Sequence, residues 1–149
     1  MTTVLYALEK IKNVYNLKYD TAKANVSSLE KECAGAQKQL DDILSYYNEY
    51  CKKLELQSIN GLNIHQLKNQ YGFINQFMPV ISHQKNIITI IQDKISKEKE
   101  HLVKCYKDLK SIEHILEEKN EKISQDLEKK EIFRQEEIFV SMHINKNSP

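Results

Sequence analysis

The residues in this sequence that could do chemistry are histidines, cysteines and acidic side chains, and their spacing decides whether they form a site. His101 and Cys105 lie four positions apart, which on a helix would place two metal-ligand types on one face. Two ligands are too few for a metal site, and no other His or Cys cluster has a regular spacing. Cys105 also falls in an apolar row, where a buried thiol is ordinary. The sequence therefore predicts no metal and no other cofactor.

Arrangements typical of enzymes are also missing from the sequence. Asp41 and Asp42 are adjacent, so on a helix their carboxylates point about 100° apart and do not converge on one site. The three glycines are isolated, which excludes a glycine-rich phosphate loop. The other histidines have no Ser, Cys or Asp partner at a motif spacing; they are His65, His83, His114 and His143. We predict a protein without enzymatic activity.

Length and composition narrow the class of protein. The chain has 149 residues, enough for one domain, and 22 basic against 21 acidic residues, which argues against a nucleic-acid-binding protein. Three glycines and two prolines leave little material for β-hairpins and favour long helices. No apolar run approaches the roughly 18 residues of a membrane span, and no secretory leader precedes the first helix. With three cysteines at no motif spacing, we expect reduced thiols and a cytoplasmic protein without direct membrane insertion.

Apolar residues in the first part of the chain recur at alternating steps of three and four, the pattern of a coiled coil. The pattern passes through Lys18, and the repeated steps of four around it predict a local stutter. A helix is predicted over about residues 3–56. Its inward row is predicted to be Val4, Leu8, Ile11, Tyr15, Ala22, Val26, Leu29, Cys33, Ala36, Leu40, Ile43, Tyr47, Tyr50 and Leu54.

A turn over about residues 57–63 interrupts this pattern, because Asn60-Gly61 is a turn dipeptide and Asn63 can cap a following helix. The second helix is predicted over about residues 64–140, with a frayed tail over 141–149. Its inward row is predicted to be Ile64, Leu67, Tyr71, Ile74, Met78, Ile81, Ile88, Ile91, Ile95, Leu102, Cys105, Leu109, Ile112 and Leu116.

Pro79 lies inside the second helical pattern. A proline within a helix removes one backbone hydrogen bond and usually kinks the helix, which is the interpretation we favour. The alternative is that the stable helix begins near Pro79, with a separate short helix over residues 64–78.

These features predict an all-α fold in which two long helices form an antiparallel coiled-coil hairpin, as one domain. A turn near Asn60 would place residue 4 opposite about residue 116. The helix beyond Leu116 would then lack an intramolecular partner, although it remains rich in apolar residues. We expect this stretch to be buried in another protein.

A second apolar row begins near the turn. Phe73, Phe77, Val80 and Gln84 step by four, three and four beside the predicted inward row. A second apolar row on a pair of helices should be partly exposed, which indicates a docking site. The alternative is a wider core near the turn.

Several of these segments together resemble the flagellar export protein FliJ family. They are Leu40-x-x-Ile43-Leu44-x-Tyr46-x-Asn48-Glu49-Tyr50-x-x-x-Leu54, then Gly61-Leu62, then Phe73-Ile74 with Ile81. The resemblance implies a cytoplasmic, stalk-like coiled coil of the type III export apparatus that is peripherally associated with the inner-membrane machinery. It further implies three partners: the hexameric export ATPase, the cytoplasmic domain of the export-gate membrane protein, and export chaperones.

The resemblance also suggests where two of these partners bind. By position, Phe73, Phe77 and Val80 match the gate-contacting row of the family, and Gln84 stands where some members have histidine. The stretch beyond Leu116 is the part we assign to the ATPase ring, with Lys129, Lys130, Phe133 and Arg134 as its contact residues.

Two other functions fit the same architecture. A stalk protein of a virulence-type secretion system would have a similar sequence. A generic coiled-coil tether would self-associate through its apolar rows, whereas the resemblance predicts a monomer.

Overall fold

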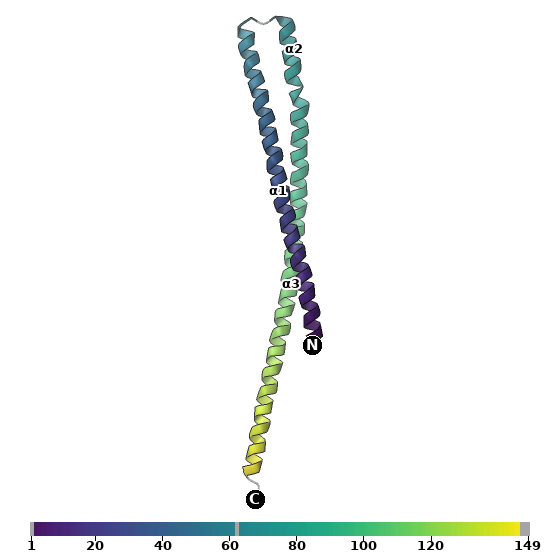
Figure 1. The fold of residues 1–149 in the computed structure, drawn as a ribbon, viewed down its shortest axis with the longest axis vertical. Coiled ribbons are helices and arrows are strands. Elements are labelled where there is room, and N and C mark those ends of the chain that lie inside the picture. Colours follow the sequence, from purple (N-terminus) through teal and green to yellow (C-terminus); the bar gives the residue numbers. More distant parts are fainter. Residues whose placement is uncertain (1, 62, 147–149) are drawn as a thin grey trace. The chain divides into compact units, whose positions relative to one another are not determined.

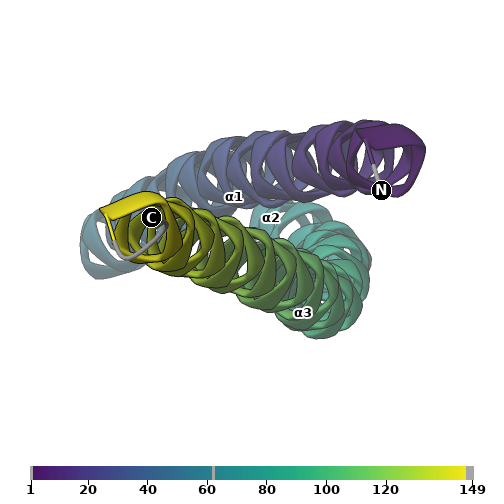
Figure 2. The same ribbon diagram turned by 90° about the horizontal axis from the view of Figure 1, so that it is seen from below.

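The computed structural model describes residues 2–61 and 63–146. Three helices follow one another along the chain: α1 (Thr2–Ile59), α2 (Ile64–Asn75) and α3 (Phe77–Lys146) (Figure 1). Within the described ranges no strand is present. α1 is one continuous helix, which Figure 2 shows from below. α1 runs antiparallel to α2 and α3, which confirms the predicted all-α helical hairpin.

The turn between α1 and α2 has the chemistry that its sequence predicts. α1 ends at Ile59, slightly later than the predicted residue 56. Gly61 has a φ of 89°, a left-handed conformation that costs glycine little and other residues more. The Asn63 side chain accepts a hydrogen bond from the backbone N–H of His65 at 3.2 Å, which confirms it as the helix cap. Leu62 lies outside the described residues.

The second helix is bent at Gln76, three residues before Pro79, as the favoured kink predicts: the α-helical pattern is interrupted between α2 and α3, while the Gln76 backbone stays in the right-handed helical region (φ −67°, ψ −20°). The Gln76 N–H bonds to the Phe73 carbonyl at 3.1 Å, a tighter pattern than that of an α-helix. Pro79 therefore lies in the first turn of α3, where its missing N–H would have no intrahelical partner. The bend therefore lies at Gln76 and not at Pro79 itself.

The chain divides into two units, and residues 20–103 form one of them. In this unit the second part of α1 packs against α2 and the first part of α3. The central cluster of its apolar core is formed by Ala36, Leu40, Ile81, Ile88 and Ile91. At the rim, Lys99 pairs with Glu30 across the helices at 3.5 Å, with both side chains more than half exposed. Such a pair adds little to stability, so burial along the narrow apolar row supplies most of it.

The inward row of α1 differs from the predicted one near the N-terminus. Val4 and Ile11 are 52% and 41% exposed, whereas Leu5, Lys12 and Tyr19 are half-buried. Steps of three and four alternate without interruption from Leu5 to Tyr47, so the stutter predicted at Lys18 is absent. The physical reason is that the aliphatic stem of lysine and the ring of tyrosine can occupy a partly exposed core position. After Tyr47 the half-buried residue is Cys51, and the predicted Tyr50 is 42% exposed.

The inward row of α2 and α3 also differs from the predicted one. Tyr71 and Met78 are 53% and 46% exposed, while Gln70 and Phe77 turn inward and are half-buried. The alternation of three and four continues across the break at Gln76, so α2 and α3 present a single row to α1.

Residues 1–19 and 104–149 form the other unit. Within its described part, Cys105, Leu109, Ile112 and Leu116 of α3 are buried, and the rings of Tyr19 and Tyr106 lie 5.8 Å apart. Ile123 is half-buried, so the cover by α1 extends further along α3 than the predicted limit at Leu116. The reason is that the turn is centred later than Asn60.

The last part of α3 lies beyond the cover of α1. From Ser124 to Lys146 every described residue is exposed and helical, and we call this stretch the overhang. The predicted end of the helix at residue 140 and the fraying from residue 141 are therefore wrong as far as Lys146. His143 and Lys146 lie in the last turn, where basic side chains interact favourably with the helix dipole. Residues 147–149 of the predicted tail lie outside the described part.

Candidate docking surfaces

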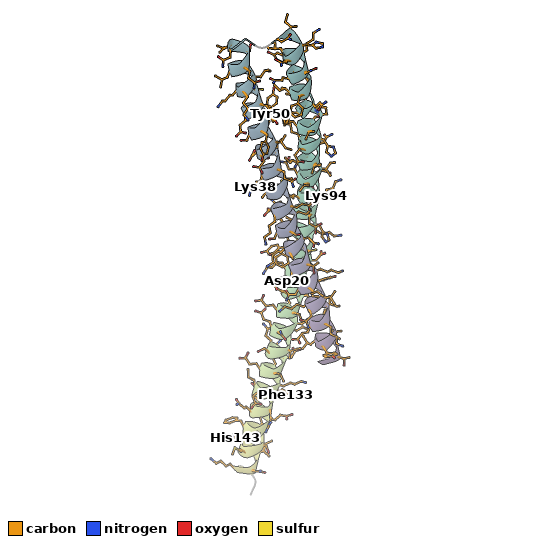
Figure 3. The ribbon with its side chains drawn as sticks, turned by 45° about the horizontal axis from the view of Figure 1, so that its top comes forward. Asp20, Lys38, Tyr50, Lys94, Phe133 and His143 are labelled. Carbon is orange, nitrogen blue, oxygen red and sulfur yellow. The ribbon has the colours of Figure 1, made fainter. Side chains whose placement is uncertain are left out.

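Four aromatic rings gather near the turn in the unit of residues 20–103. The Tyr50 ring lies 5.1 Å from that of Phe73 and 5.6 Å from that of Phe77. Phe77 also lies 6.1 Å from Tyr47 and 5.8 Å from Phe73, in edge-to-face arrangements. In Figure 3 the Tyr50 side chain extends from α1 toward the neighbouring helix. We call Tyr47, Tyr50, Phe73 and Phe77 the aromatic cluster.

The break at Gln76 contributes to the position of this cluster. Phe73 is the third-last residue of α2 and Phe77 the first of α3, and their side chains meet across the break. The same two rings contact Tyr50 from α1. Contacts of this kind contribute about 0.5–1.5 kcal/mol each beyond area burial.

Tyr47 makes a further contact inside the cluster. Its hydroxyl is hydrogen-bonded to the Cys51 side chain, and this bond is the main reason that the pKa of Tyr47 is raised above its usual value. The protonated phenol makes that bond, so the neutral form is favoured. Tyrosine is uncharged at neutral pH in any case, and the raised pKa of Tyr47 extends the neutral form to more alkaline pH.

An apolar groove opens beside the aromatic cluster. It has a volume of about 240 Å³. Phe73 and Val80 are 47% and 50% exposed, so apolar side chains on both sides of the helix break are open to a partner. We call this the groove, and its lining residues are Ile43, Tyr46, Phe73, Gln76, Phe77 and Val80.

The four residues of the predicted gate-contacting row differ in their exposure. Phe73 and Val80 are exposed, and Phe77 is half-buried, so all three remain accessible in the groove. Gln84 is only 8% exposed and belongs to the core, which contradicts its placement on an exposed row. The reason is that the inward row runs through Phe77, Ile81 and Gln84. The predicted row ran from Met78 to Ile81 and left Gln84 outside the core.

Sequence reasoning assigned no binding role to the α1 side of the groove. Ile43 and Tyr46 line it together with Phe73 and Val80 from the opposite helices. The sequence signal was the spacing, because Tyr46 follows Ile43 by three positions and so lies near it on the helix surface. In the structure the Tyr46 side chain is 60% exposed despite its large ring.

The overhang is the second candidate surface. Lys129, Lys130, Phe133 and Arg134 are all exposed, and Phe133 is 63% exposed. Figure 3 shows Phe133 and His143 on this part of α3. The other exposed large apolar side chains of the overhang are Leu127, Ile132, Ile138, Phe139, Val140, Met142 and Ile144.

The overhang also presents a shallow apolar depression. It has a volume of about 520 Å³, and Phe133, Val140 and Ile144 contribute its apolar side chains. Glu136 and Glu137 lie at its edge. Among the residues predicted to contact the ATPase ring, Phe133 lines this depression, and Lys129, Lys130 and Arg134 do not.

The described residues do not gather into a metal-binding group. They contain no group of three or more His, Cys, Asp or Glu side chains arranged to hold a metal ion. Cys105 is buried on the apolar row, and His101 is exposed on the same helix. None of the described helices carries an apolar stretch of the length that a bilayer requires.

Comparison with known proteins gives one match. The family model described as flagellar FliJ protein matches residues 5–148, essentially the whole chain. No match was found among curated proteins or among solved structures.

Proposed function

The chain belongs to the flagellar FliJ protein family, and from this membership we propose that it acts as a stalk-like component that connects the export ATPase to the export gate. Membership implies a function in flagellar protein export. The family is a structural, non-enzymatic and cytoplasmic component of that system. The finer assignment of partners to surfaces is our own.

We assign the overhang to the ring of the export ATPase, and this surface carries the proposal. Eight large apolar side chains lie on 23 residues of single helix, from Ser124 to Lys146. A soluble protein rarely leaves so much apolar surface open unless a partner covers it. Lys129, Lys130 and Arg134 add positive charge near Phe133. A single asymmetric helix in a six-fold ring would contact unequal subunits and could favour one conformation of the ring.

We assign the groove to the cytoplasmic domain of the export-gate membrane protein. Phe73, Phe77 and Val80 supply the apolar side chains that such a contact would bury. Binding at this surface would associate the protein peripherally with the membrane-embedded gate. Export chaperones are further proposed partners, and we assign no surface to them.

The test is an ATPase assay and a pull-down with purified export ATPase, with the full chain compared with a chain that ends after Ser124. We expect the full chain to bind and to stimulate ATP hydrolysis, and the shortened chain to do neither. The matched control is Val80→Ser, which alters the groove and should leave both readouts unchanged. Equal binding and stimulation by the shortened chain would refute the assignment of the overhang.

A further inference from the structure

Gln84 is a polar residue in an apolar core. Among the residues that the structure describes, it alone combines a polar side chain with burial, at 8% exposure. Its Nε2 donates to the backbone carbonyl of Ala36 at 2.9 Å and to Oε1 of Gln39 at 3.2 Å. Both acceptors belong to α1, so one side chain of α3 is tied to a specific place on the opposite helix.

The apolar residues around Gln84 do not by themselves select one alignment of the two helices. Ile81, Ile88 and Ile95 repeat at intervals of seven, so sliding α3 by one heptad would replace one isoleucine by another. The turn and the aromatic cluster hold the two sides together near the start of α3, and the rest of α3 in this unit lies beyond them. A specific contact further along α3 would secure the same register there.

Gln84 discriminates between the possible registers. In the observed register it faces Ala36, whose small side chain leaves the helix carbonyl within reach. A slip of one heptad would place Leu29 or Ile43 there instead, and a branched side chain would cover the carbonyl. The amide would then be buried without a hydrogen-bond partner, which is strongly unfavourable.

We propose that the Gln84–Ala36 hydrogen bond fixes the register of α3 against α1. Gln84 is thus a positioning residue for the groove, because Ile43 and Tyr46 on α1 face Phe77 and Val80 only in this register. Single polar residues in the cores of coiled coils likewise specify the register at some cost in stability. This inference concerns the free protein and does not depend on the proposed partners.

The test measures register by cross-linking in the full chain with Cys33, Cys51 and Cys105 replaced by alanine. Asn25→Cys with Glu98→Cys reports the native register, because the two native side chains meet at 3.4 Å. Glu32→Cys with Glu98→Cys reports a register shifted by one heptad. A short thiol cross-linker is applied to each pair, alone and combined with Gln84→Leu.

We expect the parent to give the native cross-link and Gln84→Leu to lower the ratio of native to shifted cross-link by about tenfold or more. Ala36→Leu places a larger side chain over the backbone carbonyl that Gln84 reaches, so it should also lower this ratio. The control Gln92→Leu changes an exposed glutamine of α3 and should leave the ratio unchanged.

Circular dichroism separates register from simple stability. The proposal requires that Gln84→Leu keep the helical content of the parent, with a melting temperature no lower than that of the parent, while the native cross-link declines. An undiminished native cross-link in Gln84→Leu would overturn the proposal. A decline that merely follows a loss of helix would also overturn it, because Gln84 would then act only as a stabilising residue.

Discussion

Phe77 and Val80 line the same groove, but the fold depends on them to different degrees. Val80 is 50% exposed, whereas the Phe77 ring packs against Tyr47 and Tyr50. We expect Val80→Ser to weaken binding of the gate domain severalfold without changing thermal unfolding. Phe77→Ala should weaken binding and also lower stability by about 2–4 kcal/mol. Calorimetric titration and thermal melts would measure the two effects.

The control for this pair is Val103→Ser, since Val103 is 52% exposed on α3 and lies away from the groove. It should leave gate binding unchanged. Gate binding that is insensitive to Val80→Ser would show that the groove is not the contact surface.

Ile90 and Ile91 are neighbours with opposite environments, at 56% and 4% exposure. Ile91→Ala should lower the free energy of unfolding by about 2–4 kcal/mol, because it removes buried methyl groups from a narrow core. Ile90→Ala should change it by less than about 0.5 kcal/mol. Urea unfolding followed by circular dichroism would measure both, and similar losses would mean that the helix faces are assigned wrongly.

Prediction from sequence succeeded at such residues because the isoleucines repeat with a strict helical period. It failed at Gln84, since polarity alone assigns glutamine to the surface. Only the small Ala36 opposite, whose carbonyl Gln84 reaches at 2.9 Å, makes burial possible. That pairing spans 48 positions and cannot be recognised from local spacing.

At the scale of the elements, two glycines should respond oppositely to the same substitution. Gly35 lies inside α1 with no atom within 4 Å of an added Cβ, so Gly35→Ala should raise stability by about 0.5–1 kcal/mol. Gly61 has a φ of 89°, so Gly61→Ala should lower stability by about 1–2 kcal/mol.

Thermal melts of the two glycine variants provide the measurement, and each serves as the control for the other. A gain from Gly61→Ala would mean that the turn does not need a left-handed residue.

The elements could be predicted from sequence more completely than their faces. Low glycine and proline content, Asn60-Gly61 and the alternation of threes and fours together gave two antiparallel helical segments joined near residue 60. The phase of the N-terminal row was missed, because Val4 and Ile11 are more hydrophobic than Lys12 and Tyr19. Its phase follows instead from the continuous packing of α1, which keeps the strict heptad that begins at Ala22.

The interruption of the second helix was expected at Pro79 but lies at Gln76, for a related reason. Pro79 marks a break, but the first turn of a helix tolerates proline, so the break itself lies upstream of it. Sequence gives the position of the proline but not which of the preceding residues ends the helix.

At the scale of the whole molecule, the overhang should be dispensable for folding. Every described residue from Ser124 to Lys146 is exposed, so a chain that ends after Ser124 removes no buried side chain. We expect it to keep the melting temperature of the full chain within a few degrees and to remain monomeric. Thermal melts and light scattering at micromolar concentration would measure both properties.

A large drop in melting temperature on truncation would mean that the overhang packs against the rest of the chain. Dimers of the full chain at the same concentration would favour the coiled-coil tether over the stalk.

The isolation of the overhang also affects how it would associate. A helix without neighbours relies on its own backbone bonds and on favourable side-chain spacing, and helices of this kind fray at their ends in water. Binding of the overhang to a partner would therefore bury its aromatic and aliphatic side chains and would also order the frayed end of the helix. Its calorimetric signature would be a large negative change in heat capacity, and affinity would rise with substitutions that favour helix at exposed positions outside the depression, such as Asp126.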